Sequence, residues 1–167
     1  MSVVENKSAV LSDHACKVID KWVAKFPAEH KQSAVITALT VVQEENGGSL
    51  NPDVMDAVAE YLGMARIAVY EVASFYSMFD LEPVGRHKIA VCTNISCMLC
   101  GGDKILDYVT NMLGVEVGET TTDGKFTVKR EEECLAACAG APMMAVDGHY
   151  HENLTPEKID AILDGLE

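Results

Sequence analysis

The sequence predicts a mixed α/β fold, with a helical N-terminal bundle at residues 1–83 followed by a small α/β domain at residues 84–167. In the first part, apolar residues recur every three or four positions, which is the spacing of amphipathic helices. Pro83-Val84-Gly85 interrupts this pattern, and the chain beyond it alternates between short strand-like runs and helical segments. We therefore expect two regions of different architecture that meet near residue 84.

Four short helices packed together account for the N-terminal region. Ser12 or Asp13 can cap the first helix, which Pro27 ends, and Asn51 followed by Pro52 is a typical helix start. The approximate bounds of the four are residues 13–26, 30–45, 52–62 and 66–78. The side chains that we expect on their inner faces are Ala15, Ile19, Trp22, Phe26, Val35, Ile36, Leu39, Val42, Val54, Val58 and Leu62.

The C-terminal region has the order β-α-β-β-β-α, which indicates a small α/β sandwich. Asp123-Gly124 and Asp147-Gly148 are hairpin turn sequences, and the first of them joins residues 120–122 to the strand that follows. Residues 120–122 and 125–129 are both expected to be extended, and the other expected strands cover residues 87–92, 143–146 and 149–151. The expected helices cover residues 99–113 and the segment after Thr155-Pro156.

The chain is acidic, with 26 Asp and Glu residues against 13 Lys and Arg residues and a formal net charge of −13. A surface this negative repels nucleic-acid phosphates and anionic membranes. No apolar run is long enough to span a membrane, and the first residues lack the layout of a signal peptide. We expect a cytoplasmic protein that binds no nucleic acid and does not insert into a membrane.

Four of the six cysteines form two close pairs, Cys92 with Cys97 and Cys134 with Cys138. Cytoplasmic thiols stay reduced, so such pairs indicate metal or redox chemistry more than disulfides. Four thiolates from two loops can bind a 2Fe-2S cluster, in which each iron takes two of them. Zinc also takes four thiolates, so the spacing alone leaves a zinc site as an alternative. Cys16 stands by itself on the first helix, and we interpret it as a small apolar packing residue.

Cys100 adds two further alternatives. The spacing Cys92-x4-Cys97-x2-Cys100 matches plant-type ferredoxins, so a cluster on these three cysteines and Cys134 is one of them. The other is a thioredoxin-like thiol oxidoreductase, because Cys97-x2-Cys100 follows a strand at the start of a helix, where a thiol pKa is lowered. This second hypothesis leaves the later cysteine pair without a role.

Several stretches form a combination that is specific to one family. They are Val69-Tyr-Glu-Val-Ala-Ser-Phe-Tyr-Ser-Met-Phe79, Pro83-Val-Gly-Arg-His-Lys-Ile-Ala-Val-Cys92, Cys92-x4-Cys97-x36-Cys134-x3-Cys138, Ala141-Pro142 and Leu154-Thr-Pro-Glu-Lys158. In this combination the sequence resembles the thioredoxin-like 2Fe-2S ferredoxins, the 24 kDa-type (E) subunits of NADH:ubiquinone oxidoreductase, or complex I. The resemblance runs from about the second helix to the C-terminus.

The resemblance implies that residues 84–167 form a thioredoxin-like domain that carries one 2Fe-2S cluster. The cluster and metal ligands that it implies are Cys92, Cys97, Cys134 and Cys138. Cys100 falls where the family pattern requires no cysteine. Ala136 is a departure, since relatives often have glycine between the last two ligands, and its methyl group affects how closely the backbone approaches a sulfur.

The resemblance also implies a function. Such proteins have no catalytic site of their own and exchange single electrons with the FMN of a partner subunit, which also binds NADH. The present chain has no G-x-G-x-x-G or P-loop sequence, in keeping with nucleotide binding elsewhere. We expect a peripheral position on the cytoplasmic side of the membrane, through a larger complex. The same module occurs in NAD-linked hydrogenases and formate dehydrogenases, which stay alternative hosts.

The aromatic residues Phe75, Tyr76 and Phe79 form a stripe in the fourth helical segment. Such a stripe can contact a partner subunit or pack into the core of its own domain. For Phe75 and Phe79 we expect packing in the core.

Overall fold

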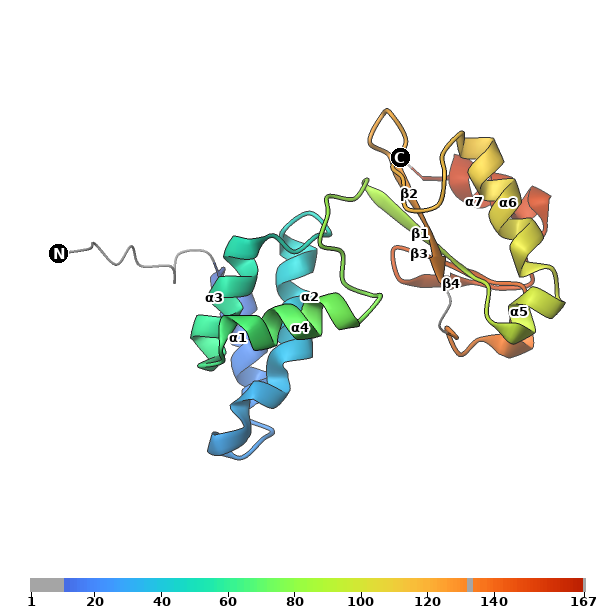
Figure 1. Ribbon diagram of the computed structural model, residues 1–167. Coiled ribbons are helices and arrows are strands. Elements are labelled where there is room, and N and C mark those ends of the chain that lie inside the picture. The colour runs from blue at the N-terminus through green and yellow to red at the C-terminus, as the bar shows by residue number, and fades with distance from the viewer. Residues whose placement is uncertain (1–10, 132–133, 167) are drawn as a thin grey trace. The chain divides into compact units, whose positions relative to one another are not determined.

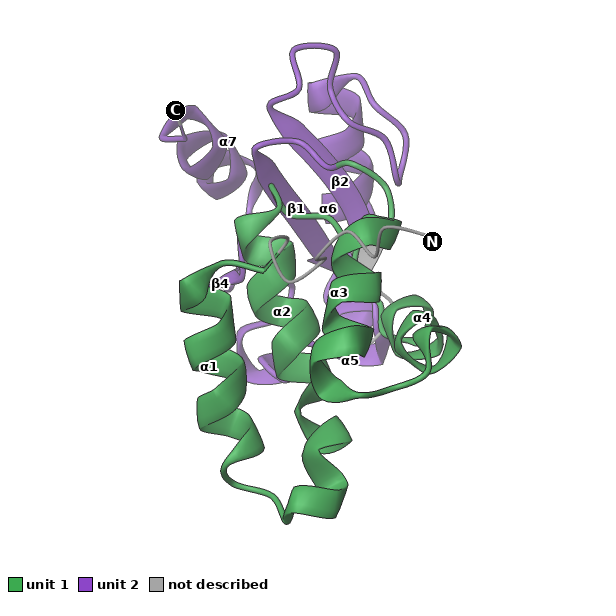
Figure 2. Cartoon of the chain, turned by 90° about the vertical axis from the view of Figure 1, so that its left-hand side faces the viewer, with its two compact units in different colours: residues 1–83 green, residues 84–167 purple. Residues whose placement is uncertain are grey.

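A computed structural model describes residues 11–131 and 134–166 of the chain. The chain divides into two compact units, residues 1–83 (unit 1) and residues 84–167 (unit 2), which Figure 2 shows in green and purple. Each unit has a hydrophobic core of its own, built from residues of that unit alone.

Unit 1 is helical (Figure 1). Its elements are α1 (Asp13–Val23), the 3-10 helix η2 (Ala28–Ala34), α2 (Val35–Glu45), α3 (Pro52–Leu62) and α4 (Arg66–Phe75). The Asn51 side chain accepts a hydrogen bond from the Val54 N–H and caps α3, as the sequence predicts, and Gly63 ends the same helix in the left-handed conformation. The predicted second helix starts later than expected, because residues 28–34 form a 3-10 turn with a break at His30.

Most of the residues predicted to face the core of unit 1 are buried. Ile36 and Trp22 are exceptions, each 38% exposed. Adjacent residues in a helix point about 100° apart, so Val35 takes the inner position and Ile36 lies outside the buried stripe. Trp22 lies near the end of its helix, where the Lys25 ammonium group is 3.3 Å from the centre of the indole ring.

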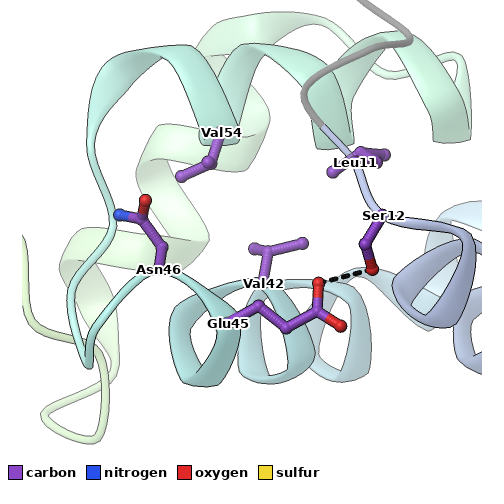
Figure 3. Close-up of a pocket in the computed structure, with 6 residues that line it drawn as sticks. All are labelled: Leu11, Ser12, Val42, Glu45, Asn46 and Val54. Atoms are coloured by element: carbon purple, nitrogen blue, oxygen red, sulfur yellow. Dashed lines mark hydrogen bonds between the residues drawn. The ribbon is translucent and has the colours of Figure 1, made fainter.

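A small pocket in unit 1 lies where the start of α1 meets the end of α2 (Figure 3). The Glu45 carboxylate accepts a hydrogen bond from the Ser12 hydroxyl at 2.7 Å and contacts His14 Nδ1 at 2.8 Å. Both contacts hold the pKa of Glu45 below its ordinary value, and the hydrogen bond from Ser12 has the larger effect. Because the Ser12 oxygen also accepts the Ala15 N–H, one side chain caps α1 and ties it to α2.

The aromatic stripe divides between the core and the surface of unit 1. Phe79 is buried, as expected. Phe75 is 76% exposed, so the prediction that it packs in the core is wrong. It is the last residue of α4 and meets the Tyr76 ring edge to face at 5.0 Å, on the outside of the unit.

Unit 2 has a four-stranded sheet in the order β2-β1-β3-β4. The strands are β1 (His87–Cys92), β2 (Phe126–Glu131), β3 (Met144–Val146) and β4 (His149–His151). β1 pairs with β2 in parallel, and the other two pairs are antiparallel. The helices are α5 (Ile95–Leu99), α6 (Gly102–Leu113), α7 (Pro156–Asp164) and the 3-10 turn η3 (Cys138–Gly140).

The core of unit 2 lies between the sheet and the two longer helices, and α6 and α7 lie on the same face of the sheet (Figure 1). Its buried residues are Ile89, Val91, Ile105, Leu106, Val109, Phe126, Val128, Met144, Val146, Leu154, Ile159 and Leu163. Tyr108 of α6 donates a hydrogen bond to Asp160 of α7 at 2.7 Å and joins the two helices. The mixed α/β class is confirmed, and the four strands follow one another along the chain as predicted.

Two elements of unit 2 differ from the sequence prediction. The predicted helix at residues 99–113 starts later than expected, at Gly102, because Gly101 adopts a left-handed conformation (φ +94°) that separates α6 from the preceding α5. The segment at residues 120–122 makes one antiparallel bridge, between Thr120 and Thr127, in place of a strand. The short helix α5 was not foreseen.

Replacing Asn51 with alanine should lower the free energy of unfolding of unit 1 by about 1 kcal/mol, because the Val54 N–H loses its acceptor. Urea unfolding followed by circular dichroism measures the loss. Asn51→Ser keeps an acceptor and is the control. Equal losses in the two variants would show that the cap does not stabilise α3.

Candidate metal centre in unit 2

Four cysteines gather at one edge of the sheet because of the strand pairing. Cys92 is the last residue of β1, and its partner in the parallel β2 is Glu131. Neighbouring parallel strands end at the same edge, so Cys134, three residues beyond Glu131 in the sequence, follows the strand that ends beside Cys92. Cys97 lies within α5 and Cys138 opens η3. The fold thus brings together the four cysteines that the family resemblance implies as ligands.

The four thiols divide into an inner and an outer pair. Cys92 and Cys97, the inner pair, are only 2% and 1% exposed and form a small apolar core with Met143. Leu135, Ala137 and Ala141 pack against this core. Cys134 and Cys138, the outer pair, are exposed. The site is therefore closed on one side by the protein and open on the other.

Burial has a direct effect on the inner pair. It raises the pKa of the Cys97 thiol to about 11, and a hydrogen bond with Cys92 adds to the increase. The Met143 backbone N–H donates to the Cys97 sulfur and acts in the opposite direction. Without a metal, Cys97 is therefore protonated at neutral pH.

The outer pair behaves differently. The Cys134 and Cys138 sulfurs are 3.2 Å apart. Two hydrogen bonds lower the pKa of Cys134. The stronger effect comes from the Cys138 thiol, and the weaker from the Ala136 N–H at 3.4 Å. The same thiol–thiol bond raises the pKa of Cys138, while a hydrogen bond from the Ser96 hydroxyl lowers it. Because Ser96 belongs to α5, this last bond joins the helix of Cys97 to the loop of the outer pair.

The two pairs interact with each other, since the Cys138 thiol is electrostatically coupled to Cys92 and Cys97. Within residues 11–131 and 134–166, no group of three or more His, Cys, Asp or Glu side chains is arranged to hold a metal ion. The thiols instead form two adjacent pairs. A donor set of this kind suits a 2Fe-2S cluster, in which each of two irons takes two thiolates.

The remaining cysteines, Cys100 and Cys16, do not belong to these two pairs. Cys100 is exposed at the C-terminal end of α5, where it lines a surface hollow with Met98 and Leu99. A thiol oxidoreductase needs an accessible thiol whose pKa is lowered, whereas Cys97 is buried and its pKa is raised. Cys16 is half-buried and packs against the core of unit 1, as expected.

The loop between the outer cysteines has a left-handed residue that is not glycine. Ala136 has φ +60°, a conformation that costs an alanine more than a glycine. This conformation directs its N–H to the Cys134 sulfur. The predicted departure from the family pattern therefore falls at the one position of this loop where glycine would relieve backbone strain.

Sequence reasoning missed the apolar surface beside the site. Ile95, Met98 and Leu99 of α5 are all exposed, and Leu99 is 78% exposed. They lie on both sides of Cys97 in the sequence. The helix α5 therefore buries its cysteine on one face and exposes three large apolar side chains to solvent. Exposed apolar groups of this kind mark sites of protein association. The sequence shows that these residues are apolar, but only the structure shows that all three are exposed on the same short helix.

The chain is similar over most of its length to known proteins. The family described as thioredoxin-like 2Fe-2S ferredoxin matches residues 19–167. An E-type component of the NADH-quinone oxidoreductase of Rhizobium meliloti is 43% identical over 148 residues, 89% of this chain and 86% of the relative. The corresponding E-type component from Rickettsia bellii is 44% identical over 144 residues, 86% of each chain.

A longer relative and a solved structure are also similar. The mitochondrial NADH dehydrogenase (ubiquinone) flavoprotein 2 of Dictyostelium discoideum is 42% identical over 149 residues, which are 89% of this chain and 60% of that relative. An air-oxidised NAD+-reducing NiFe-hydrogenase has a TM-score of 0.64 at 18% identity, over 75% of this chain and 22% of that chain. At this identity the likeness concerns the fold alone.

None of the helices in the described residues has the length and apolar character needed to cross a membrane.

Replacing Ala136 with glycine should raise the free energy of unfolding of unit 2 by about 1 kcal/mol, because the left-handed conformation no longer strains a side chain. Urea or thermal unfolding measures the gain. Ala137→Gly is the matched control, since Ala137 has φ −110°, so glycine there relieves no strain and should not raise the free energy of unfolding. A loss in both variants would contradict the assigned conformation.

Proposed function

Because the chain belongs to the thioredoxin-like 2Fe-2S ferredoxin family, we propose that it is an electron-transfer subunit with one 2Fe-2S cluster. The proposed ligands are Cys92, Cys97, Cys134 and Cys138. The observation that carries this proposal is the gathering of four thiols, in two adjacent pairs, at one edge of the sheet of unit 2. Two irons that each take two thiolates match this arrangement.

The residues around the thiols would tune such a centre. When bound, a 2Fe-2S cluster supplies one-electron redox chemistry. The apolar core around Cys92 and Cys97 keeps water from the inner side. The N–H groups of Met143 and Ala136 donate to sulfurs of the inner and outer pairs. Such hydrogen bonds stabilise added negative charge and raise the reduction potential.

The proposed host is an NADH:quinone oxidoreductase, in which a partner subunit holds FMN and binds NADH. Relatives that are 42–44% identical bear names of this enzyme, whereas the hydrogenase likeness at 18% identity concerns the fold alone. We assign both nucleotides to the partner because the sequence contains no G-x-G-x-x-G or P-loop pattern. The chain would then have no catalytic site of its own and would reach the cytoplasmic side of the membrane only through the larger complex.

The exposed side chains Ile95, Met98 and Leu99 are the proposed contact for the flavin subunit. They belong to the helix that carries Cys97, so a partner seated on them would lie next to the thiols. Electron transfer weakens steeply with distance, which makes the surface nearest the cluster the effective place for a flavin partner. An apolar contact also suits a chain whose net charge is −13, because it does not require a matching charge.

Serine substitution of any one of the four proposed ligands should abolish or distort the cluster, because a hydroxyl replaces the thiolate that binds iron. Cys100→Ala and Cys16→Ala should keep it, since neither thiol belongs to the two pairs. The measurement is anaerobic purification followed by iron, acid-labile sulfide and zinc content and by EPR of the reduced sample. The unsubstituted chain should contain about two irons and two sulfides.

The same measurement can contradict the proposal in two ways. A colourless Cys100→Ala protein would replace the proposed ligand set by one that includes Cys100. Zinc in place of iron in the anaerobically prepared protein would remove the electron-transfer function altogether.

Replacing Leu99 with glutamine should raise the dissociation constant for the flavin subunit by about tenfold or more, because an apolar anchor is lost from the contact. Calorimetric titration of the cluster-loaded chain with that subunit measures the change. Val117→Gln, at another exposed apolar residue of unit 2, is the control. An equal affinity for the two variants would place the partner elsewhere.

A further inference from the structure

Gly102 is the buried first residue of α6 and lies against the backbone of both inner cysteines. A Cβ atom at this position would be 2.8 Å from the Cys92 carbonyl oxygen. It would also be 2.9 Å from the carbonyl carbon and from the carbonyl oxygen of Cys97. All three neighbours are backbone atoms, which cannot rotate away as the end of a side chain can.

The need for glycine here is a need for space, not for a special backbone conformation. Gly101 and Gly114, at the two ends of α6, have φ of +94° and +66°, and nothing lies within 4 Å of a Cβ built on either. Gly102 shows the opposite combination, with a crowded Cβ position and no left-handed φ. Alanine is the better helix former, so glycine at 102 runs against local helix propensity.

The close approach connects three elements that position the inner thiols. Cys92 ends β1, Cys97 lies in α5, and Gly102 begins α6. Since the start of α6 touches the backbone of both cysteines, it limits how far the end of β1 and the helix α5 can move relative to each other. The distance between the inner thiols depends on that same relative position.

We propose that Gly102 is a positioning residue for the inner thiol pair, because it lets α6 start in contact with the Cys92 and Cys97 backbone and so sets the spacing of their sulfurs. The role in cluster binding rests on the proposed function. The packing role does not, and it can be tested in the chain without metal. A methyl group at 102 has to push α6, α5 or the end of β1 aside.

The test uses the full-length Gly102→Ala chain in two states. In the chain freed of metal by a chelator, iodoacetamide labelling with peptide mass mapping gives the alkylation rate of each cysteine. We expect Cys97 to react about tenfold faster than in the unsubstituted chain, because overpacking opens its buried site. In the cluster-loaded chain, we expect shifted EPR g-values and a shifted midpoint potential, or less than half of the normal iron content.

Two alanine variants of the same helix are the controls. Gly114→Ala strains the left-handed end of α6 and lowers the melting temperature, but lies at the opposite end of the helix from the cysteines. Lys104→Ala adds the same residue type at an exposed position two residues after Gly102. Both should leave the Cys97 alkylation rate, the EPR spectrum and the midpoint potential unchanged.

The outcomes separate this inference from the proposed function. Unchanged labelling, EPR spectrum and potential in Gly102→Ala would overturn the positioning role. So would loss of the circular dichroism spectrum in Gly102→Ala alone, since a residue that only positions two cysteines leaves the sheet and helices intact. If no variant binds iron and Cys97 still reacts faster in Gly102→Ala, the proposed function fails and the packing role of Gly102 stands.

Discussion

The parallel pairing of β1 with β2 is the constraint on which the candidate site depends. Parallel neighbours need a crossover connection, and here α5 and α6 provide it between Cys92 and Phe126. The pairing also brings the ends of both strands to one edge of the sheet. Cys92 and the loop that follows Glu131 therefore meet, although more than a third of unit 2 separates them in the sequence. Without this pairing, the two cysteine pairs would have no common location.

The asymmetry between the inner and the outer thiols has consequences for metal binding. A buried thiol with a raised pKa, such as Cys97, must lose its proton before it can bind a metal ion. The outer pair is exposed and shares a hydrogen bond, with the pKa of Cys134 lowered. The proposed cluster would therefore be held on the outside by a thiol whose pKa is lowered, that of Cys134, and on the inside by thiols that the protein buries. The apolar core with Met143 then excludes water from the inner side.

Sequence reasoning correctly predicted the features that depend on short-range patterns. The caps at Ser12 and Asn51 and the strand at residues 87–92 follow from local preferences that the tertiary structure does not override. The mixed α/β class and the family are confirmed, while the ligand set stays a prediction. Reasoning failed at Phe75 and at α5. Phe75 ends its helix, and a residue at a helix end can face either solvent or the core without a change in the sequence pattern. The helix α5 has five residues, too few to show the repeat of apolar positions that indicates a helix.

The sequence by itself determined which residues were available: two close cysteine pairs, the break near residue 84, and the periodicity of each longer helix. Only the tertiary structure decided which thiols are buried, that Cys100 faces outward, and that Gly102 touches the backbone of two cysteines. The physical reason is that spacing along the chain limits what neighbouring residues can reach, while burial and close approach depend on segments far apart in sequence. The four cysteines that the sequence presents as two pairs come close to one another only when β1 and β2 lie side by side.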